Sequence, residues 1–285
     1  MGKHIFWNTL RVELRKASRS KLLWTALLLG CAFLALDLYE SYINIQQAID
    51  NTQRSEELGL GKGYLGYSLF SSWCGIAGGT YGSALFLTVW PVLAAMAYGW
   101  SYNDERIAGV YDQIAVRVGP RRYFLAKHTA VFVSGGIAVM VPMLLDLLVM
   151  ALFYPATDPV YLRDCNFLCA LNYASPWAFS LARCLIYFLF GGAAACVCHV
   201  AGTYLRHGVM VILTPYAILM AIESLTTMLR ESIDPVEILY TLSPFQMVRT
   251  AGFADPGWLL LGTLVIMTVG SYALGYWQVK RNELV

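Results

Sequence analysis

The chain has 285 residues, of which 58% are hydrophobic and only 13% are charged, and its formal net charge is +2. Soluble domains carry about 25% charged residues, so this composition excludes an ordinary soluble domain. We expect the lipid bilayer, and not a nucleic acid, to surround most of the chain.

Residues 1–21 predict an amphipathic helix on the cytoplasmic side. Apolar side chains recur every three or four positions on one face, and arginines line the other, which suits a helix lying in the headgroup layer. The alternative is a plain basic flank to the first span. Because charges continue to Lys21 and no small-residue cleavage site follows, we expect no cleaved secretory signal. The two faces are Phe6, Leu10, Leu14 and Ala17, and Arg11, Arg15 and Arg19.

Six apolar segments follow, each long enough to cross a hydrocarbon layer of about 30 Å as a helix. Lipid offers no partners to backbone N–H and C=O groups, which favours helices, and the alternation typical of a membrane barrel is absent. We therefore predict an all-α integral membrane protein with six transmembrane helices. The spans are predicted at about 22–39, 79–98, 129–153, 177–200, 209–228 and 258–278, followed by a tail at 279–285.

Two of the connecting segments are longer than simple loops. Residues 40–78 are predicted to form a long outer loop. Residues 230–257 mix apolar and polar side chains and include Pro235, Pro244 and Pro256. This second segment predicts short helices that lie at the membrane surface or dip into it before the last span, and an ordinary surface loop is the alternative.

The basic residues predict the orientation of the chain. Most of the twenty lysine and arginine residues fall on the side of the N-terminus, and cytoplasmic loops are enriched in such residues. We therefore expect a multi-pass protein of the cell membrane with both termini in the cytoplasm. The residues on that side are Lys3, Arg11, Arg15, Lys16, Arg19, Lys21, Arg106, Arg117, Arg121, Arg122, Lys127, Arg206, Lys280 and Arg281.

Catalytic and metal-binding motifs are not found. The string GLGKGY at 59–64 lacks the spacing of a phosphate-binding loop, and no HExxH occurs. The string CVCH at 196–199 has one residue too few for haem attachment. We therefore expect no catalytic residue, no metal ligand and no bound cofactor in this chain.

The cysteines have two expected roles. Cys184, Cys196 and Cys198 fall in the fourth span, where cysteine behaves as a small apolar residue. Three others are expected on the outer side and could form a disulfide, although the sequence does not select the pair. These are Cys74, Cys165 and Cys169.

A charged segment at about 103–118 lies between the second and third predicted spans. Apolar anchors recur every three or four residues, which predicts an amphipathic helix that ends at Gly119-Pro120. Because acidic residues alternate with basic ones, the segment suits docking to a soluble partner better than a basic loop that only sets topology. A solvated loop is the alternative. The anchors are Ile107, Val110, Tyr111 and Ile114.

In this layout the chain resembles the permease subunit of an ABC-2-type ATP-binding-cassette exporter. The coupling region of that family carries an acidic residue, a glycine, a basic residue and a lysine that opens span three. The matching residues are Glu105, Gly109, Arg121 or Arg122, and Lys127, and Ser243-Pro244-Phe245-Gln246 stands where the family has a re-entrant segment. The family usually has Ser or Thr before the basic residue, where this chain has Gly119-Pro120.

The resemblance implies a division of labour between subunits. The permease pairs with a second copy or a homologue, and separate ATPase subunits dock on the coupling helix and bind ATP and Mg²⁺, so the chain is not an enzyme by itself. It would export an amphipathic or hydrophobic substrate, such as a peptide, an antibiotic or a lipid-like molecule. The docking residues would be Asp104, Glu105, Arg106, Gly109, Tyr111, Asp112 and Arg117.

Two other functions remain open from the sequence. An ion-coupled secondary transporter would need an ion site near the bilayer midplane and usually internal repeats, and neither is evident. A membrane-embedded sensor or immunity protein would bind a ligand without moving it and would need no ATPase.

Asp146, Arg183 and Glu223 are the ionisable residues that fall well inside predicted spans. Such residues are costly in lipid and are usually paired or functional. Asp146 and Arg183 lie at similar depths in adjacent spans, so we hypothesise that they form an ion pair. The pair would be a structural brace or part of a polar exit route.

Small residues predict close helix contacts. Glycines are spaced by four at the start of the second span, and residues 191–195 interrupt the fourth span with glycine and alanine. A dimer contact and packing within one chain are both consistent with this pattern.

Overall fold

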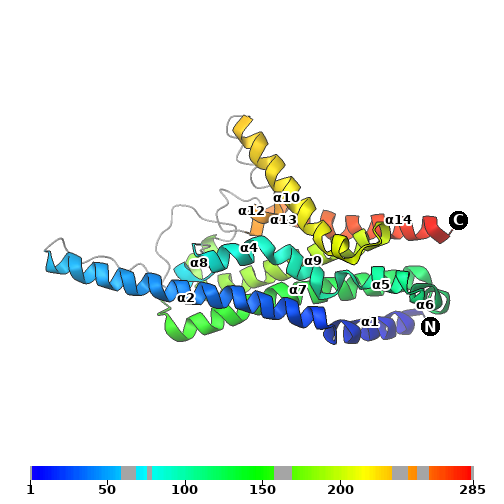
Figure 1. The fold of residues 1–285 in the computed structure, drawn as a ribbon, viewed down its shortest axis with the longest axis horizontal. Coiled ribbons are helices and arrows are strands. Elements are labelled where there is room, and N and C mark those ends of the chain that lie inside the picture. The colour runs from blue at the N-terminus through cyan, green and yellow to red at the C-terminus, as the bar shows by residue number, and fades with distance from the viewer. Residues whose placement is uncertain are drawn as a thin grey trace.

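The computed structural model describes residues 2–58, 69–75, 79–156, 169–232, 243–248 and 257–283, and these residues contain helices and no strand. Six helices are long and apolar enough to cross a membrane, which confirms the all-helical class and the predicted number of candidate spans. They form an elongated bundle (Figure 1). The spans are Lys21–Glu57, Tyr81–Gly99, Pro120–Phe153, Pro176–Tyr204, Gly208–Leu229 and Gly257–Arg281.

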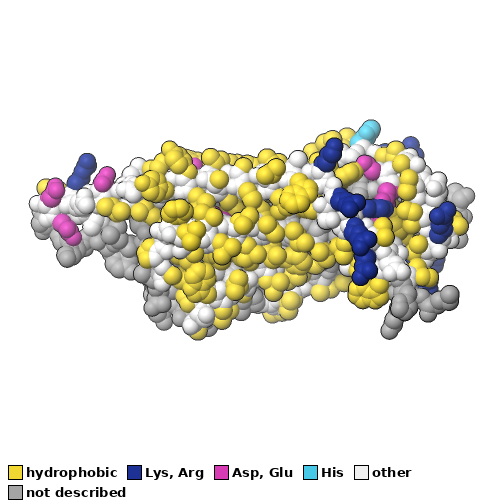
Figure 2. Space-filling model, turned by 90° about the horizontal axis from the view of Figure 1, so that it is seen from below, with side chains coloured by type: hydrophobic (Ala, Val, Ile, Leu, Met, Phe, Trp, Pro, Cys, Tyr) yellow, Lys and Arg dark blue, Asp and Glu magenta, His cyan; other side chains and the backbone are white. Residues whose placement is uncertain are grey.

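The surface of the bundle is divided along its long axis. In Figure 2, apolar side chains cover the middle of the visible face, and charged side chains gather toward the two ends. Lysine and arginine are concentrated at one of these ends. A broad apolar belt between charged ends is the surface expected of a protein whose middle is surrounded by lipid.

The first span is much longer than its apolar part. α2 runs over Lys21–Glu57, a length of 37 residues, so residues predicted as an outer loop continue the helix. Most residues after Tyr39 are polar, which is why hydropathy ends the span there, but neither glycine nor proline follows until Gly59. Helix propensity therefore carries the helix well beyond the apolar stretch.

α7 (Pro120–Phe153) and α9 (Pro176–Tyr204) pack together at the centre of the bundle. A Cβ added to Gly135 of α7 would lie 2.3 Å from Cβ of Ala195, and one added to Gly191 of α9 would lie 3.0 Å from the carbonyl oxygen of Gly135. The small residues of the fourth span therefore bring two helices of the same chain together.

The second span changes from an α-helix to a π-helix near its end. α4 (Tyr81–Ala94) contains Pro91 and continues as a π-helix, η1 (Ala95–Gly99). The last span has the same form, with α13 (Gly257–Val265), η2 (Ile266–Gly270) and α14 (Ser271–Glu283). π-turns often occur at functional sites.

The charged segment differs from the single helix predicted at about 103–118. It forms two helices, α5 (Ser101–Ile107) and α6 (Val110–Val118), which we call the α5–α6 segment. Gly109 separates them with a left-handed φ of 69°, and Gly119 ends α6 with a φ of 88°. A side chain at either position would be strained. Gly109 therefore permits the bend between α5 and α6, and Gly119 permits the end of α6.

The N-terminal helix and three short helices complete the fold. α1 (Gly2–Ser18) packs on α7, and α10 (Gly208–Ser232) packs on α9. The short helices are α3 (Leu69–Ser72), α8 (Cys169–Ala174) and α12 (Pro244–Val248). In Figure 1 both chain termini lie at the end of the bundle that carries α5 and α6.

Candidate functional site

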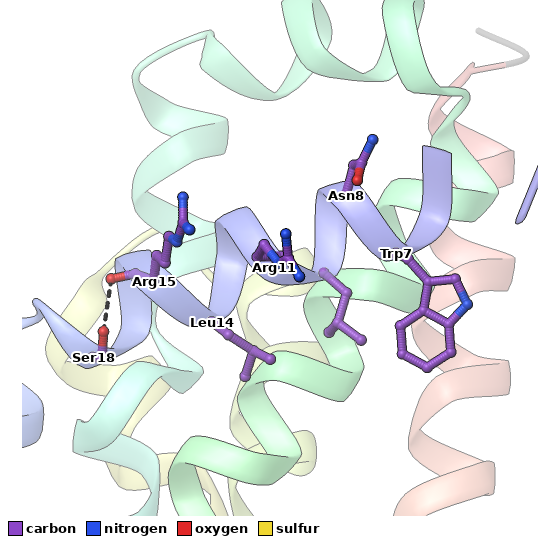
Figure 3. A pocket seen from close by; sticks show the side chains of 7 residues that line it. Trp7, Asn8, Arg11, Leu14, Arg15 and Ser18 are labelled. Atoms are coloured by element: carbon purple, nitrogen blue, oxygen red, sulfur yellow. Dashed lines mark hydrogen bonds between the residues drawn. The ribbon is translucent and has the colours of Figure 1, made fainter. Parts of the chain in front are cut away.

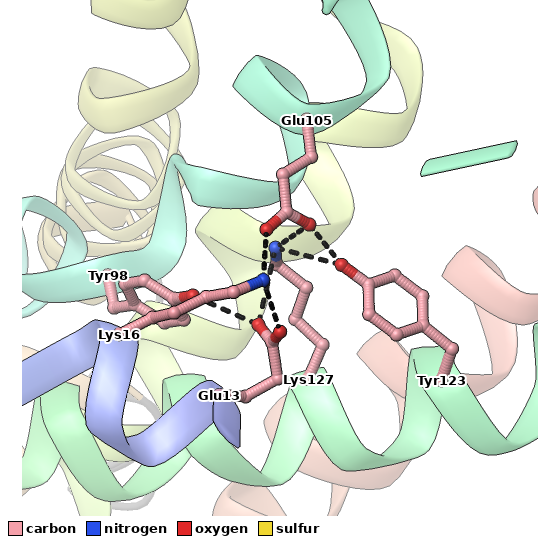
Figure 4. A network of polar contacts seen from close by, with 6 residues as sticks. All are labelled: Glu13, Lys16, Tyr98, Glu105, Tyr123 and Lys127. Atoms are coloured by element: carbon pink, nitrogen blue, oxygen red, sulfur yellow. Dashed lines mark hydrogen bonds and ion pairs between the residues drawn. The ribbon is translucent and has the colours of Figure 1, made fainter. Parts of the chain in front are cut away.

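A cluster of charged and hydroxyl side chains is buried where α1, the end of the second span, α5 and α7 meet. Each of these elements contributes at least one polar group. Figure 4 shows the six side chains pointing toward one another. We call this cluster the buried polar network: Glu13, Lys16, Tyr98, Glu105, Tyr123 and Lys127.

Glu13 is the centre of the half of the network that lies on α1. Its Oε1 accepts from the ammonium of Lys16 at 2.7 Å, and its Oε2 accepts from the hydroxyl of Tyr98 at 2.9 Å. The ammonium of Lys127 lies 3.5 Å from the same Oε2. The side chains of Glu13 and Lys127 are only 2% and 0% exposed, so each charge depends on these partners.

Glu105 is the centre of the other half. Its Oε1 accepts from Lys16 at 3.0 Å, and its Oε2 accepts from the hydroxyl of Tyr123 and the ammonium of Lys127. Lys127 also donates to the hydroxyl oxygen of Tyr123 at 3.2 Å. Two carboxylates thus face two ammonium groups, and every carboxylate oxygen has a donor, which is the condition under which buried charges are tolerated.

The network changes the proton affinity of its groups outside the candidate spans. Burial alone would raise the pKa of Glu105, but the ammonium of Lys127, the hydrogen bonds from Lys127 and Tyr123, and the charge of Lys16 hold that pKa below its usual value. Burial alone would lower the pKa of Lys16, but its contacts with Glu13 and Glu105 raise that pKa above its usual value. Both groups are therefore held in their charged forms.

Only part of this network follows from the sequence. Glu105 and Lys127 stand at the positions matched by the family resemblance, and the structure brings them together. Glu13 was missed, although a signal exists, since it falls on the same helical face as Leu10 and Ala17. A single acid on an otherwise apolar face indicates a buried partner. The two tyrosines carry no comparable signal.

The other residues predicted to dock a partner differ in their surroundings. Asp104 and Arg117 are exposed, whereas Tyr111 is buried with its ring 5.3 Å from that of Tyr102. The side chain of Asp112 lies outside the described residues. Tyr111 is therefore part of the small core that attaches α6 to the bundle, and the exposed side chains are the ones a partner can reach.

Arg106 fixes α5 to the end of α9. Its guanidinium donates to the carbonyl oxygen of Thr203 and, at 3.0 Å, to that of Leu205. Nearby, the side-chain amide of Asn103 donates to the carbonyl oxygen of Arg206 at 3.2 Å. The last carbonyls of a helix have no partners within it, so Arg106 serves α9 as a cap and α5 as an anchor.

The apolar face of α1 is used inside the protein. Phe6, Leu10 and Leu14 pack against Ala126 and Ala130 of α7. On the outside, a hollow of about 560 Å³ runs along α1, where Trp7 is 63% exposed (Figure 3). The apolar stripe that suggested a helix facing lipid is therefore largely covered by α7. Arg11 and Arg15 line the hollow.

Two of the charged residues inside the spans hold the short helix α12. The guanidinium of Arg183 donates to the carbonyl oxygen of Val248 at 2.6 Å and to that of Gly75 at 3.3 Å. Glu223 accepts from the side-chain amide of Gln246. The rest of the segment predicted to form short helices before the last span, residues 233–242 and 249–256, lies outside the described residues.

The hypothesised pair of Asp146 and Arg183 does not form. Within the described part of the chain, no ion pair joins them, and both carboxylate oxygens of Asp146 have no hydrogen-bond partner. The ion pair predicted from the similar depths of the two residues was wrong, because the guanidinium of Arg183 donates to backbone carbonyls instead. Asp37 of α2 is buried as well.

Among the described residues, the histidines and cysteines form no set of metal ligands. His128 and His199 are buried with their rings 5.4 Å apart, yet no group of three or more His, Cys, Asp or Glu side chains in the described ranges could hold a metal ion. Cys74 is buried and free. The side chains of Cys165 and Cys169 lie outside the described residues.

Comparison with known proteins finds no matching family model and no matching curated protein.

Proposed function

We propose that the chain is the membrane-spanning permease subunit of an ATP-binding-cassette exporter. The observation that supports this function most directly is the attachment of the α5–α6 segment to the bundle. Glu105 ties α5 to α1 and α7, and Arg106 ties it to the end of α9. A segment held at so many points moves together with the spans.

The outer side of the α5–α6 segment has the composition of a docking surface. Ile107 is 63% exposed and Val116 is 88% exposed, next to the exposed charges of Asp104 and Arg117. Exposed apolar side chains surrounded by charges are typical of a surface that binds another protein. Separate ATPase subunits that bind ATP and Mg²⁺ are the proposed partners.

Transmission of movement follows from the same contacts. If nucleotide binding moves the docked ATPase, the displacement reaches α1 and α7 through the buried polar network, because its ion pairs link all three elements. Only a difference in contacts between two states can shift such an equilibrium. The proposed result is outward transport of an amphipathic or apolar substrate by this chain paired with a second permease.

The orientation belongs to this proposal. The end that carries α5, α6 and both termini is the one where basic side chains gather (Figures 1 and 2). Loops rich in Lys and Arg stay in the cytoplasm. This end would therefore face the cytosol, and the protein would lie in the cell membrane.

The test is copurification from the native host of a subunit identified by its nucleotide-binding sequence. We expect this subunit to copurify with the wild type and not with the variant that combines Ile107→Asp and Val116→Asp. Leu58→Asp is the control, since Leu58 is 73% exposed at the end of α2, away from α5 and α6. If no nucleotide-hydrolysing subunit accompanies the wild type, the proposal fails.

An ion-coupled transporter is the second candidate, and one observation favours it. Asp37 and Asp146 are buried in neighbouring spans, and three of their oxygens, Oδ2 of Asp37 and both of Asp146, have no hydrogen-bond partner among the described residues. Buried carboxyls of this kind can bind protons. Proton uptake into vesicles that is lost in Asp146→Asn and independent of any ATPase would support this candidate over the first.

A further inference from the structure

An apolar groove of about 740 Å³ opens on the side of the bundle. α9 lies between its two walls and packs against both of them, α10 on one side and the α13–η2–α14 span on the other. We call it the lateral groove. Its walls belong to helices that are long and apolar enough to cross a membrane, so the groove lies where lipid chains are the solvent.

The lining of the lateral groove offers almost nothing to a polar ligand. Three Ser and Thr hydroxyl groups line it, and each donates to a carbonyl of its own span: Thr214 to Met210 at 2.7 Å, Thr263 to Leu259 at 2.9 Å, and Ser271 to Thr268 at 2.9 Å. Tyr204 adds a fourth hydroxyl, and most of the other lining residues are aliphatic. Such a lining favours a hydrocarbon chain.

The length of the lateral groove suits a lipid chain. The wall from Thr263 to Leu274 is about 17 Å long at 1.5 Å per residue. An acyl chain that lies along this wall contacts aliphatic side chains over its length and ends beside Tyr204.

A basic hollow adjoins one end of the lateral groove. It measures about 550 Å³ and is lined by Arg106, Ile107, Tyr204 and Arg206. Tyr204 lines both spaces, so the hollow and the groove are neighbours. The guanidinium of Arg106 is engaged by the end of α9, whereas the side chain of Arg206 is exposed. An anionic group at this end would meet the charge of Arg206.

We propose that the lateral groove and the basic hollow together bind one anionic phospholipid. One acyl chain lies in the groove between α10 and the last span, and the phosphate lies beside Arg206. Arg106 and Ile107 belong both to the basic hollow and to the α5–α6 segment proposed to dock an ATPase, but the lipid site involves neither the buried polar network nor a nucleotide, so lipid binding can be tested separately from transport.

The test compares lipid retention in matched glycine variants. Gly270 lines the groove, and a Cβ there would meet only Ile266, at 4.0 Å, so Gly270→Phe fills the space. Gly262 lies in the same span but does not line the groove, and no described atom lies within 4 Å of a Cβ there. Gly262→Phe is therefore the control. The probes are phosphatidylglycerol and phosphatidylcholine with identical chains, counted by native mass spectrometry after delipidation.

We expect the wild type and Gly262→Phe to retain phosphatidylglycerol, and Gly270→Phe to lose it. Arg206→Gln, on an exposed loop, should keep the fold and lower the preference for phosphatidylglycerol over phosphatidylcholine by about tenfold. Equal retention of the two lipids by the wild type, or unchanged retention in Gly270→Phe, would overturn the proposal. The same spectra report mass, so a loss of dimer without a loss of lipid in Gly270→Phe would assign the groove to a second copy instead.

Discussion

The ammonium of Lys127 on α7 lies 3.5 Å from the carboxylate of Glu13 on α1, and neither side chain is more than 2% exposed. The two residues lie on helices that are distant in sequence, and each is among the charged partners that compensate the burial of the other. A buried charge without its partner is strongly destabilising. This contact therefore makes the position of α1 depend on the third span and on the α5–α6 segment that shares Lys127.

Lys127→Met should be among the most destabilising substitutions in the chain. It leaves Glu13 and Glu105 with Lys16 as their only ammonium partner in the network, and breaking a buried ion pair costs about 3–5 kcal/mol. Thermal unfolding in detergent measures the loss. Lys280→Met, which removes an exposed charge, is the control. Adding Glu105→Gln to Lys127→Met should recover part of the stability, and an unimproved double variant would contradict the charge-balance account.

The stabilising contribution of Glu105 should depend on pH in one direction. Its pKa is held below its usual value, mainly by Lys127 acting against the effect of burial. The contribution is therefore complete above the unfolded pKa of about 4.3 and is lost as the pH falls through the lower folded pKa. The difference in melting temperature between the wild type and Glu105→Gln should be constant near neutral pH and shrink below about pH 4. A difference that grows on acidification would have the wrong sign.

The sequence predicts the spans well and the network poorly, for different physical reasons. Hydropathy reports which residues avoid water, and that property is local, so six candidate spans follow from it. It does not report where a helix stops, as the polar half of α2 shows. Lys16 is a local i,i+3 partner of Glu13. The other partners, Tyr98 and Lys127, depend on which helices pack together, and no local pattern contains that information.

The break between α5 and α6 is a second feature that periodicity missed. Apolar anchors continue across Gly109 with helical spacing, so the pattern predicts one helix. The left-handed φ of 69° at Gly109 redirects the chain without changing that spacing. Only the identity of the residue indicates the break, because glycine adopts this conformation at little cost.

Gly109→Ala should therefore destabilise the α5–α6 segment by about 1 kcal/mol, the cost of a side chain in a left-handed conformation. Steric overlap is not the cause of this destabilisation, since no described atom lies within 4 Å of a Cβ at this position. Gly262→Ala is matched in space but lies within α13, where alanine should stabilise the helix by about 0.5–1 kcal/mol. Equal effects in the two variants, measured by thermal unfolding, would contradict a role for backbone conformation.

Asp146→Asn and Arg183→Gln should have unequal and additive effects. Asp146 has no hydrogen-bond partner to lose within the described residues, so the neutral amide should leave stability unchanged or raise it. Arg183→Gln removes donors from the carbonyls of Val248 and Gly75 and should cost about 1–3 kcal/mol. The double variant should equal the sum of the two single variants. A coupling free energy between the two substitutions well above about 0.5 kcal/mol would indicate that Asp146 and Arg183 do form an ion pair.

The close approach of α7 and α9 should be sensitive to side-chain size. A Cβ at Gly135 would lie 2.3 Å from Cβ of Ala195 and 3.3 Å from the carbonyl oxygen of Ala94, so Gly135→Ala must push two helices apart. Overpacking of this kind costs about 1–3 kcal/mol. Gly208→Ala, at the start of α10 with no described atom within 4 Å, should cost nothing. If both variants keep the wild-type melting temperature and Gly135→Ala instead weakens a dimer, the small residues of the fourth span join two copies and not two helices of one chain.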